Sequence, residues 1–255
     1  MATSISSDLS FDPDRAVTAD EVPPVVADLA AGAPIRWIWA NGVHGRTYRI
    51  DRGDHTEYVK WGADHEEVDL ELEAEKLRWA RTSVTVPEVL GVGRDSATST
   101  WMHTAGIPAQ SAIAPRWKAD PLTAARAIGA GLRRFHDHLP VADCPWSWRI
   151  ADRATKIKKP EDQVLIEQAP PEDQLVVCHG DACSPNTLIG DDGRCAGHVD
   201  LGSLGVGDRW ADLAIATYSL SWNFEPANED ELLAAYGVEP DVDRIAYYRR
   251  LWDAT

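Results

Sequence analysis

The chain of 255 residues lacks the long apolar runs that a membrane-spanning protein needs. No stretch approaches the roughly 18 apolar residues expected of a transmembrane helix. The polar, acidic start over residues 1–14 has neither a cationic segment nor an apolar core, so no signal peptide is predicted. Internal repeats and low-complexity tracts are also missing. These absences favour a cytoplasmic globular protein without a membrane partner, built as one two-lobed domain or two closely packed ones.

Positive charge is scarce: 25 basic residues stand against 41 acidic ones, which gives a formal net charge of −16. A nucleic-acid-binding protein needs a basic face against the phosphates, so nucleic acid is not the expected partner. An acidic surface concentrates cations instead, which suits a small polycationic substrate. Charge carries modest weight here, because many soluble proteins rich in Ala and Asp are simply acidic.

Cysteine is also scarce, with four residues at positions 144, 178, 183 and 195. Cys178 and Cys183 flank His179 and three further residues, which could suggest zinc. That spacing lacks the paired ligands of a structural zinc site. Free buried thiols in a reducing compartment are therefore predicted in preference to a metal site or a disulfide.

The most informative segment that is present runs from Cys178 to Asn186 and reads Cys-His-Gly-Asp-Ala-Cys-Ser-Pro-Asn. The spacing His-x-Asp-x₄-Asn is that of the kinase catalytic loop, where Asp accepts the proton of the attacking hydroxyl and Asn holds Mg²⁺. Asp200-Leu201-Gly202 follows where kinases place the aspartate that binds the metal at the ATP phosphates. Either motif alone would fit an ordinary turn or strand end. Their order and spacing together indicate a kinase.

The upstream half supplies the partners of that motif. Alternating runs at 35–39, 47–50 and 57–61 predict three strands. The first turn carries Gly42 and Gly45, which allow backbone N–H groups to approach phosphates. Lys60 lies in an apolar strand, as the nucleotide-binding lysine of kinases does. On its own, Lys60 would be read as a solvated strand residue.

A helix is predicted over roughly 66–81, with Leu70, Glu73 and Leu77 on one face. The Glu73 carboxylate then falls on the apolar stripe, where it needs a partner, and Lys60 is the obvious one. Such a Lys–Glu pair aligns the ATP phosphates in kinases. Glu71 and Glu75 are expected to face solvent.

The C-terminal half is predicted to be helical. Asp120 can cap a helix that begins at Pro121, and the apolar positions Ala125, Ile128, Leu132, Phe135 and Leu139 form its core-facing stripe. His136 and His138 flank that stripe and are interpreted as structural. Asn228 and Glu231 have capping-box spacing, Gly237 is the expected end of that helix, and Asp241 the expected start of the last one.

These segments resemble the aminoglycoside phosphotransferases, a branch of the protein-kinase-like fold, and most closely those acting at a 3′ or 3″ hydroxyl. The similarity runs from about Trp37 to the C-terminus and is most specific over 176–214. It implies an α+β, two-lobed protein: a tail and lead-in over 1–34, a small antiparallel-sheet N-lobe over 35–104 and a larger, mainly helical C-lobe over 105–255. A hinge is expected near 101–108, with ATP between the lobes.

The resemblance also implies roles for single residues. Asp181 would be the catalytic base, Asn186 and Asp200 would hold Mg²⁺, and Lys60 with Glu73 would serve the phosphates of ATP or another nucleoside triphosphate. The hinge backbone at Met102, His103 and Thr104 would read the base. Asp212 is interpreted as scaffolding of the catalytic loop, because it can cap the helix that begins there. The acceptor would be a small cationic amino sugar, with candidate carboxylates at Glu225, Asp230, Glu231 and Asp253.

The sequence departs from the family pattern in three places. Ser203 stands where the family commonly carries Arg, a loss that Arg209 or one of Lys156, Lys158 and Lys159 could offset. The segment 151–174, which covers the substrate in the family, is short, and the C-terminal tail differs. A kinase of another small hydroxylated metabolite or antibiotic therefore stays open as an alternative. A non-catalytic, kinase-like binding module is disfavoured, because the predicted lysine, base and metal ligands are all intact.

Overall fold

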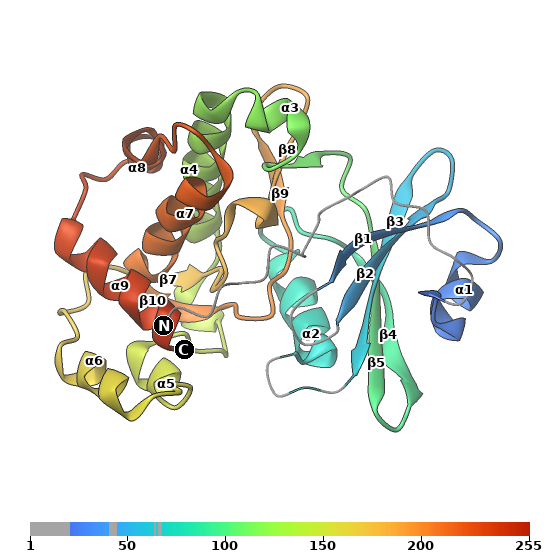
Figure 1. Ribbon diagram of the computed structural model, residues 1–255, viewed down its shortest axis with the longest axis horizontal. Coiled ribbons are helices and arrows are strands. Elements are labelled where there is room, and N and C mark those ends of the chain that lie inside the picture. The colour runs from blue at the N-terminus through green and yellow to red at the C-terminus, as the bar shows by residue number, and fades with distance from the viewer. Residues whose placement is uncertain (1–20, 41–44, 64, 66–67) are drawn as a thin grey trace. The chain divides into compact units, whose positions relative to one another are not determined.

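The computed structural model describes residues 21–40, 45–63, 65 and 68–255 (Figure 1). The expected tail over 1–14 and Gly42 lie outside these ranges. The chain divides into two compact units. The first unit comprises the residues up to Trp79 together with Pro87–Pro108, and the second comprises Ala80–Val86 and Ala109–Thr255. The segment Ala80–Val86 thus belongs with the second unit, although it falls inside the predicted N-lobe range 35–104.

The first unit is built on an antiparallel sheet in the order β1-β2-β3-β5-β4. The three strands expected from alternation are present as β1 (Ile35–Ala40), β2 (Arg46–Asp51) and β3 (Thr56–Ala63). The other two are β4 (Val89–Ser96) and β5 (Ser99–Ala105). Every described neighbour pair in this sheet is antiparallel, as predicted for the smaller lobe.

The two faces of this sheet carry different helices. Val59 of β3 is fully buried in an apolar cluster with Val26 and Ala30 of α1 (Pro24–Ala30), a helix that the sequence did not reveal. The next residue, Lys60, points to the opposite face, because successive strand side chains alternate. There it contacts α2 (Leu70–Ala80). Figure 1 shows α1 and α2 on opposite sides of the sheet.

Helix α2 begins at Leu70 and not at about residue 66. The Asp69 carboxylate accepts a hydrogen bond from the backbone N–H of Leu72 at 2.9 Å, as an N-capping side chain does. Leu70 and Leu77 are 3% and 1% exposed, so the predicted inward face is correct. Glu71 and Glu75 are exposed, also as predicted.

The second unit combines two small sheets with a helical body. Strand β7 (Leu175–Cys178) pairs with β10 (Gly205–Asp208), while β6 (Gln110–Ser111), β8 (Thr187–Ile189) and β9 (Cys195–His198) form the other sheet. The longer helices are α4 (Pro121–His138), α7 (Trp210–Asn223), α8 (Glu229–Tyr236) and α9 (Val242–Ala254). Three short ones are α3 (Pro115–Lys118), α5 (Ile150–Ala154) and α6 (Val164–Glu167). In Figure 1, α5 lies beside the C-terminal end of α9, where the Lys158 N–H donates to the Ala254 carbonyl at 3.2 Å.

Helix α4 supplies much of the core of this unit. Asp120 accepts from the Thr123 N–H at 3.2 Å and caps the helix as predicted. All five residues of its predicted stripe are at most 3% exposed. Burying such large aliphatic or aromatic side chains stabilises the fold by roughly 1.5–3 kcal/mol each. In the described ranges, no helix is both long and apolar enough to cross a membrane.

Two of the three predicted helix boundaries in the last 30 residues are confirmed. Gly237 ends α8 with a φ of 92°, and Asp241 caps α9 by accepting from the Arg244 N–H at 3.0 Å. The capping box at Asn228 and Glu231 does not form. Asn228 has a φ of 55° and its amide donates to the Pro226 carbonyl, while Glu231 pairs with Arg126 at 2.9 Å.

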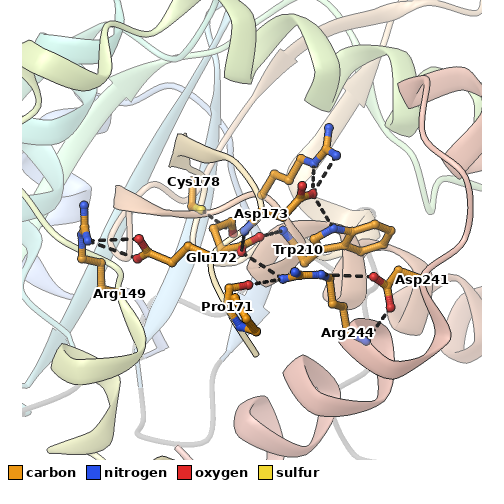
Figure 2. Close-up of polar contacts among 10 residues, drawn as sticks. Arg149, Pro171, Glu172, Asp173, Cys178, Trp210, Asp241 and Arg244 are labelled. Atoms are coloured by element: carbon orange, nitrogen blue, oxygen red, sulfur yellow. Dashed lines mark hydrogen bonds and ion pairs between the residues drawn. The ribbon is translucent and has the colours of Figure 1, made fainter. Parts of the chain in front are cut away.

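A polar cluster anchors the loop that enters β7 (Figure 2). Asp208 accepts from the N–H groups of Asp173 and Trp210 at 2.7 and 2.9 Å. Asp173 in turn accepts from the Trp210 indole at 2.8 Å, and Arg244 bridges Asp208 and Asp241. The end of the short 151–174 segment is thereby tied to the starts of α7 and α9, which fixes the entry to the catalytic strand.

Candidate active site

The catalytic motif forms a loop at the end of β7. Hydrogen bonds within this loop and to Val199 hold Asp181, Asn186 and Asp200 near one another. The Asn186 side-chain amide donates to the Asp181 carbonyl at 2.9 Å, which orients Asn186. The backbone N–H of Val199 donates to the Asn186 carbonyl at 3.0 Å, and the His179 ring bonds the Val199 carbonyl at 3.0 Å. Asp200 follows directly. The structure therefore brings Asp181, Asn186 and Asp200 together, as the motif spacing predicted.

Two backbone positions in this site adopt left-handed conformations. Gly180 has a φ of 83°, and a Cβ there would lie 2.1 Å from the Ser203 carbonyl oxygen, so no other residue fits. Asp200 has a φ of 66°, which is uncommon for a residue other than glycine. Such conformations persist where the surrounding structure enforces them and are typical of functional sites.

The Asp181 carboxyl group lies in an environment that disfavours its charge. Its Oδ1 atom is buried without a hydrogen-bond partner among the described residues. Burial, and then the negative charge of Asp200, raises the pKa of Asp181 to about 6. A carboxyl group with a raised pKa beside a second carboxylate is a typical arrangement for acid–base chemistry or for binding a cation.

The oxygen atoms available at this site fit Mg²⁺. The Asp200 carboxylate and the Asn186 amide oxygen are hard ligands, and Mg²⁺ in nucleotide-dependent enzymes takes only one or two carboxylates besides water and phosphate oxygens. Across the described ranges, no group of three or more His, Cys, Asp or Glu side chains is arranged to hold a metal ion by itself. All four cysteines are free thiols.

Asp212 scaffolds the catalytic loop through its backbone. This fully buried carboxylate accepts from the N–H groups of His179 at 2.6 Å and Gly180 at 2.9 Å. It also bonds the His136 ring at 2.9 Å, and His136 reaches the Tyr236 hydroxyl at 2.8 Å. Burial works to raise the pKa of Asp212, but these hydrogen bonds and the neighbouring histidines hold it below its ordinary value. The scaffolding role agrees with the sequence interpretation, whereas the reason given for it was wrong: Asp208, not Asp212, bonds the N–H at the start of α7.

The predicted ion pair in the first unit is present. The Lys60 Nζ lies 2.7 Å from the Glu73 Oε1. The Glu73 side chain is 6% exposed and that of Lys60 is 27% exposed, so the carboxylate is fixed while the ammonium group keeps access to solvent. Gly45 precedes β2 and packs so closely that its Cα would lie 3.1 Å from a Cβ on Gly62.

We expect Glu73→Ala to lower kcat/KM for ATP by about tenfold, the effect of losing roughly 1.4 kcal/mol of phosphate positioning. Lys60 would keep its charge but lose the carboxylate that orients it. Glu75→Ala is the matched control, because Glu75 is exposed on the same helix. Steady-state kinetics with ATP as the varied substrate measures both. Equal kcat/KM values for Glu73→Ala and Glu75→Ala would contradict a role for the Lys60–Glu73 pair.

The three residues expected to read the base lie in a strand of the first unit. Met102, His103 and Thr104 lie inside β5, which pairs with β3 on one side and β4 on the other. Their backbone groups lie between those two neighbouring strands, with a register shift between Val89 and Gly91 opposite His103 and Thr104. The His103 ring bonds buried Glu57 at 2.9 Å. The chain leaves the sheet only after Ala105, so the connecting segment is 106–108.

The candidate acceptor carboxylates do not form one cluster. Glu231 is paired with Arg126, while Glu225, Asp230 and Asp253 are exposed. Asp253 lies in the last turn of α9, at a different end of the second unit from α8 (Figure 1). Arg209 does not replace the missing family arginine at Ser203, because it pairs with Asp173 at 2.7 Å. Lys156 stands over the Trp148 ring at 5.3 Å.

A lysine–glutamate pair and a loop carrying an aspartate of raised pKa beside metal-type oxygen ligands, on this two-unit α+β architecture, define a protein-kinase-like phosphotransferase. The chain belongs to the phosphotransferase enzyme family, whose pattern it matches over residues 38–249.

Comparison with known proteins agrees with this family membership. The chain is 34% identical over 214 residues to an aminoglycoside 3′-phosphotransferase of Streptomyces fradiae, covering 72% of this chain and 78% of the relative. The crystal structure of aminoglycoside-3′-phosphotransferase of type VIII has a TM-score of 0.73 and 26% identity, covering 87% of this chain and 94% of that one. An aminoglycoside phosphotransferase of Streptomyces rimosus, solved with ADP and streptomycin, has a TM-score of 0.67 and 26% identity. The match covers 91% of this chain and 99% of that one. The predicted fold class is confirmed.

Proposed function

We propose that the protein transfers the γ-phosphate of ATP, with Mg²⁺, to the 3′ or 3″ hydroxyl of an aminoglycoside-type antibiotic. The observation that carries this proposal is the convergence of Asp181, Asn186 and Asp200 on one loop system held by Asp212. The relatives named as aminoglycoside phosphotransferases support the acceptor class. Dependence on ATP suits an enzyme of the cytoplasm.

In the proposed reaction Asp181 accepts the proton of the acceptor hydroxyl and orients its oxygen toward the γ-phosphorus. A base works best when its pKa lies near the operating pH, and a pKa raised to about 6 moves Asp181 in that direction. Lys60, oriented by Glu73, contacts the ATP phosphates. Bound Mg²⁺ would be held by Asn186 and Asp200 and would neutralise phosphate charge. Positioning and charge neutralisation then supply most of the rate enhancement, without a covalent intermediate.

A second acceptor class has one structural observation in its favour. The short segment that follows Trp148 forms the helices α5 and α6 with a 3-10 helix at Pro160–Gln163 between them, and it exposes Lys156, Lys158 and Lys159. A cationic lining would select against a polycation and would favour a neutral or anionic hydroxylated compound.

A panel assay tests the proposed function directly. ATP consumption is measured with kanamycin, with streptomycin and with a neutral hydroxylated compound, and the product is located by mass spectrometry and NMR. Phosphorylation of either aminoglycoside supports the proposal. Turnover of the neutral compound alone would replace the amino-sugar acceptor with the second class.

We expect KM for the aminoglycoside to rise with ionic strength while KM for ATP responds less, because salt screens the attraction between ammonium groups and exposed carboxylates. Asp230→Asn should raise KM for the acceptor more than it lowers kcat, the signature of lost uniform binding. Glu231→Gln is the matched control, because Arg126 already neutralises Glu231. Initial rates at two or more salt concentrations measure both effects. A salt-independent KM for the acceptor would argue against binding by carboxylates.

A further inference from the structure

The C-terminal end of α7 presents a large aromatic side chain to solvent. Trp222 is 49% exposed, although ten of the 14 residues of the helix that carries it are buried. Exposure of a tryptophan to this extent forgoes the free energy of burying one of the largest apolar side chains. Single exposed apolar side chains are common on protein surfaces, but Trp222 differs in the contacts that hold its ring.

The Trp222 ring packs against the ring of Tyr218, which is held in turn by Arg249. It lies 4.5 Å from the Tyr218 ring, at an interplanar angle of 58°. The Arg249 guanidinium covers Tyr218 at 5.0 Å. Arg249 is itself held by Glu229 at 2.6 Å and by the Thr217 hydroxyl at 3.0 Å. The indole therefore has a defined orientation in which about half of its surface stays open.

Trp222 lies one helical turn after Ser219, the residue of α7 that contacts the loop carrying Asp181. The backbone N–H of Ser184, three residues after Asp181, donates to the Ser219 hydroxyl at 2.9 Å. Residues three and four apart share a helix face, so Trp222 and Asn223 neighbour Ser219. The Asn223 amide donates to the Ser219 carbonyl at 2.8 Å, a bond within the same helix. Trp222 thus lies about one helical turn from Ser219, which bonds the loop that carries Asp181.

The chemistry of an open indole face selects one kind of ligand group. Tryptophan attracts cations over its face better than tyrosine or phenylalanine does, and its flat surface also packs against the C–H groups of a ring. Glu225, exposed in the turn after α7, adds a carboxylate three residues further on. An ammonium-bearing sugar ring matches both features.

We propose that Trp222 is a specificity-determining residue on which an ammonium-bearing ring of the acceptor stacks while its hydroxyl is presented to Asp181. This inference rests on the proposed function, since it assigns a further residue to the acceptor of that reaction. It places recognition of the acceptor on an aromatic platform at the catalytic loop, in addition to the exposed carboxylates.

Steady-state kinetics with kanamycin and streptomycin test the platform. Trp222→Ala is expected to raise KM for the acceptor about tenfold, the scale of a cation over an exposed to partly desolvated indole. The kcat value should change less than about twofold, and Trp222→Phe, which keeps an aromatic face, should recover most of the loss. Val242→Ala is the control, because Val242 is an apolar residue of α9 that is 72% exposed. A Trp222→Ala variant with the wild-type KM would overturn the platform.

A binding measurement separates this inference from the proposed function. Either aminoglycoside should quench the intrinsic fluorescence of the wild type, and the quenching should fall in Trp222→Phe. Quenching that is unchanged in Trp222→Phe would overturn the platform even where the wild type phosphorylates the drug. Binding with Trp222-dependent quenching but without turnover would instead overturn the proposed reaction and leave the platform standing.

Discussion

Replacing Asp181 with Asn is expected to lower kcat by about 10²-fold or more, the usual contribution of a positioned acid–base group. The variant keeps the shape of the side chain but cannot accept the proton of the acceptor hydroxyl. The Asn186 amide donates to the Asp181 carbonyl on the main chain, so the loop geometry should survive. Affinity for nucleotide should therefore stay near the wild-type value.

Rapid-quench or coupled assays at saturating acceptor measure the loss, and nucleotide titration checks that binding is intact. Asp137→Asn is a suitable control, because that carboxylate is exposed on α4 and paired with Arg133. Near-wild-type turnover of Asp181→Asn would show that another group is the base. A parallel loss of nucleotide affinity would point to a metal ligand instead.

Replacing Asp200 with Ala is expected to abolish the Mg²⁺-dependent part of ATP binding, and Asn186→Ala to weaken it. A Mg²⁺ site with so few protein ligands cannot lose a carboxylate and still hold an ion that dehydrates reluctantly. Asp200 also raises the pKa of Asp181, so its removal should leave the base more acidic.

Calorimetric titration of ATP with and without Mg²⁺ measures this effect. Asp192→Ala, in the exposed turn before β9, serves as the control for loss of a carboxylate. An Asp200→Ala protein whose ATP affinity still increases with Mg²⁺ would remove Asp200 from the metal site. Thermal unfolding of each variant establishes that the comparison is made between folded proteins.

The parts of this protein that sequence predicted well are those with local signals. Lys60 and Glu73 were paired because a strand alternates and a helix repeats its face every three to four residues. The catalytic loop was found because His179, Asp181 and Asn186 lie within nine consecutive residues. Helix boundaries at Asp120, Gly237 and Asp241 follow from side chains or φ angles that act within one turn.

The parts that were missed depend on contacts between distant segments. Asp212 reaches His179 and Gly180 from another element, and the His136 ring comes from a third, so no window of sequence contains the network. The one available signal was the position of Asp212 near the start of a helix, and it was misinterpreted, because Asp208 makes the capping bond. The strand that contains Met102–Thr104 was not predicted, because its apolar and polar residues do not reveal two flanking strands. The capping-box spacing at Asn228 was overridden by the turn that precedes it.

The segment Ala80–Val86 has a consequence for how such proteins can be recombined. The chain enters the second unit there, returns to the first at Pro87 and leaves it again after Pro108. The Thr85 carbonyl accepts from the backbone N–H of His198, two residues before Asp200. A chimera joined near residue 105 would therefore place one parent's Thr85 segment against the other parent's segment 198–200. Exchange of the N-terminal parts between relatives should succeed only when 80–86 travels with the C-terminal parent.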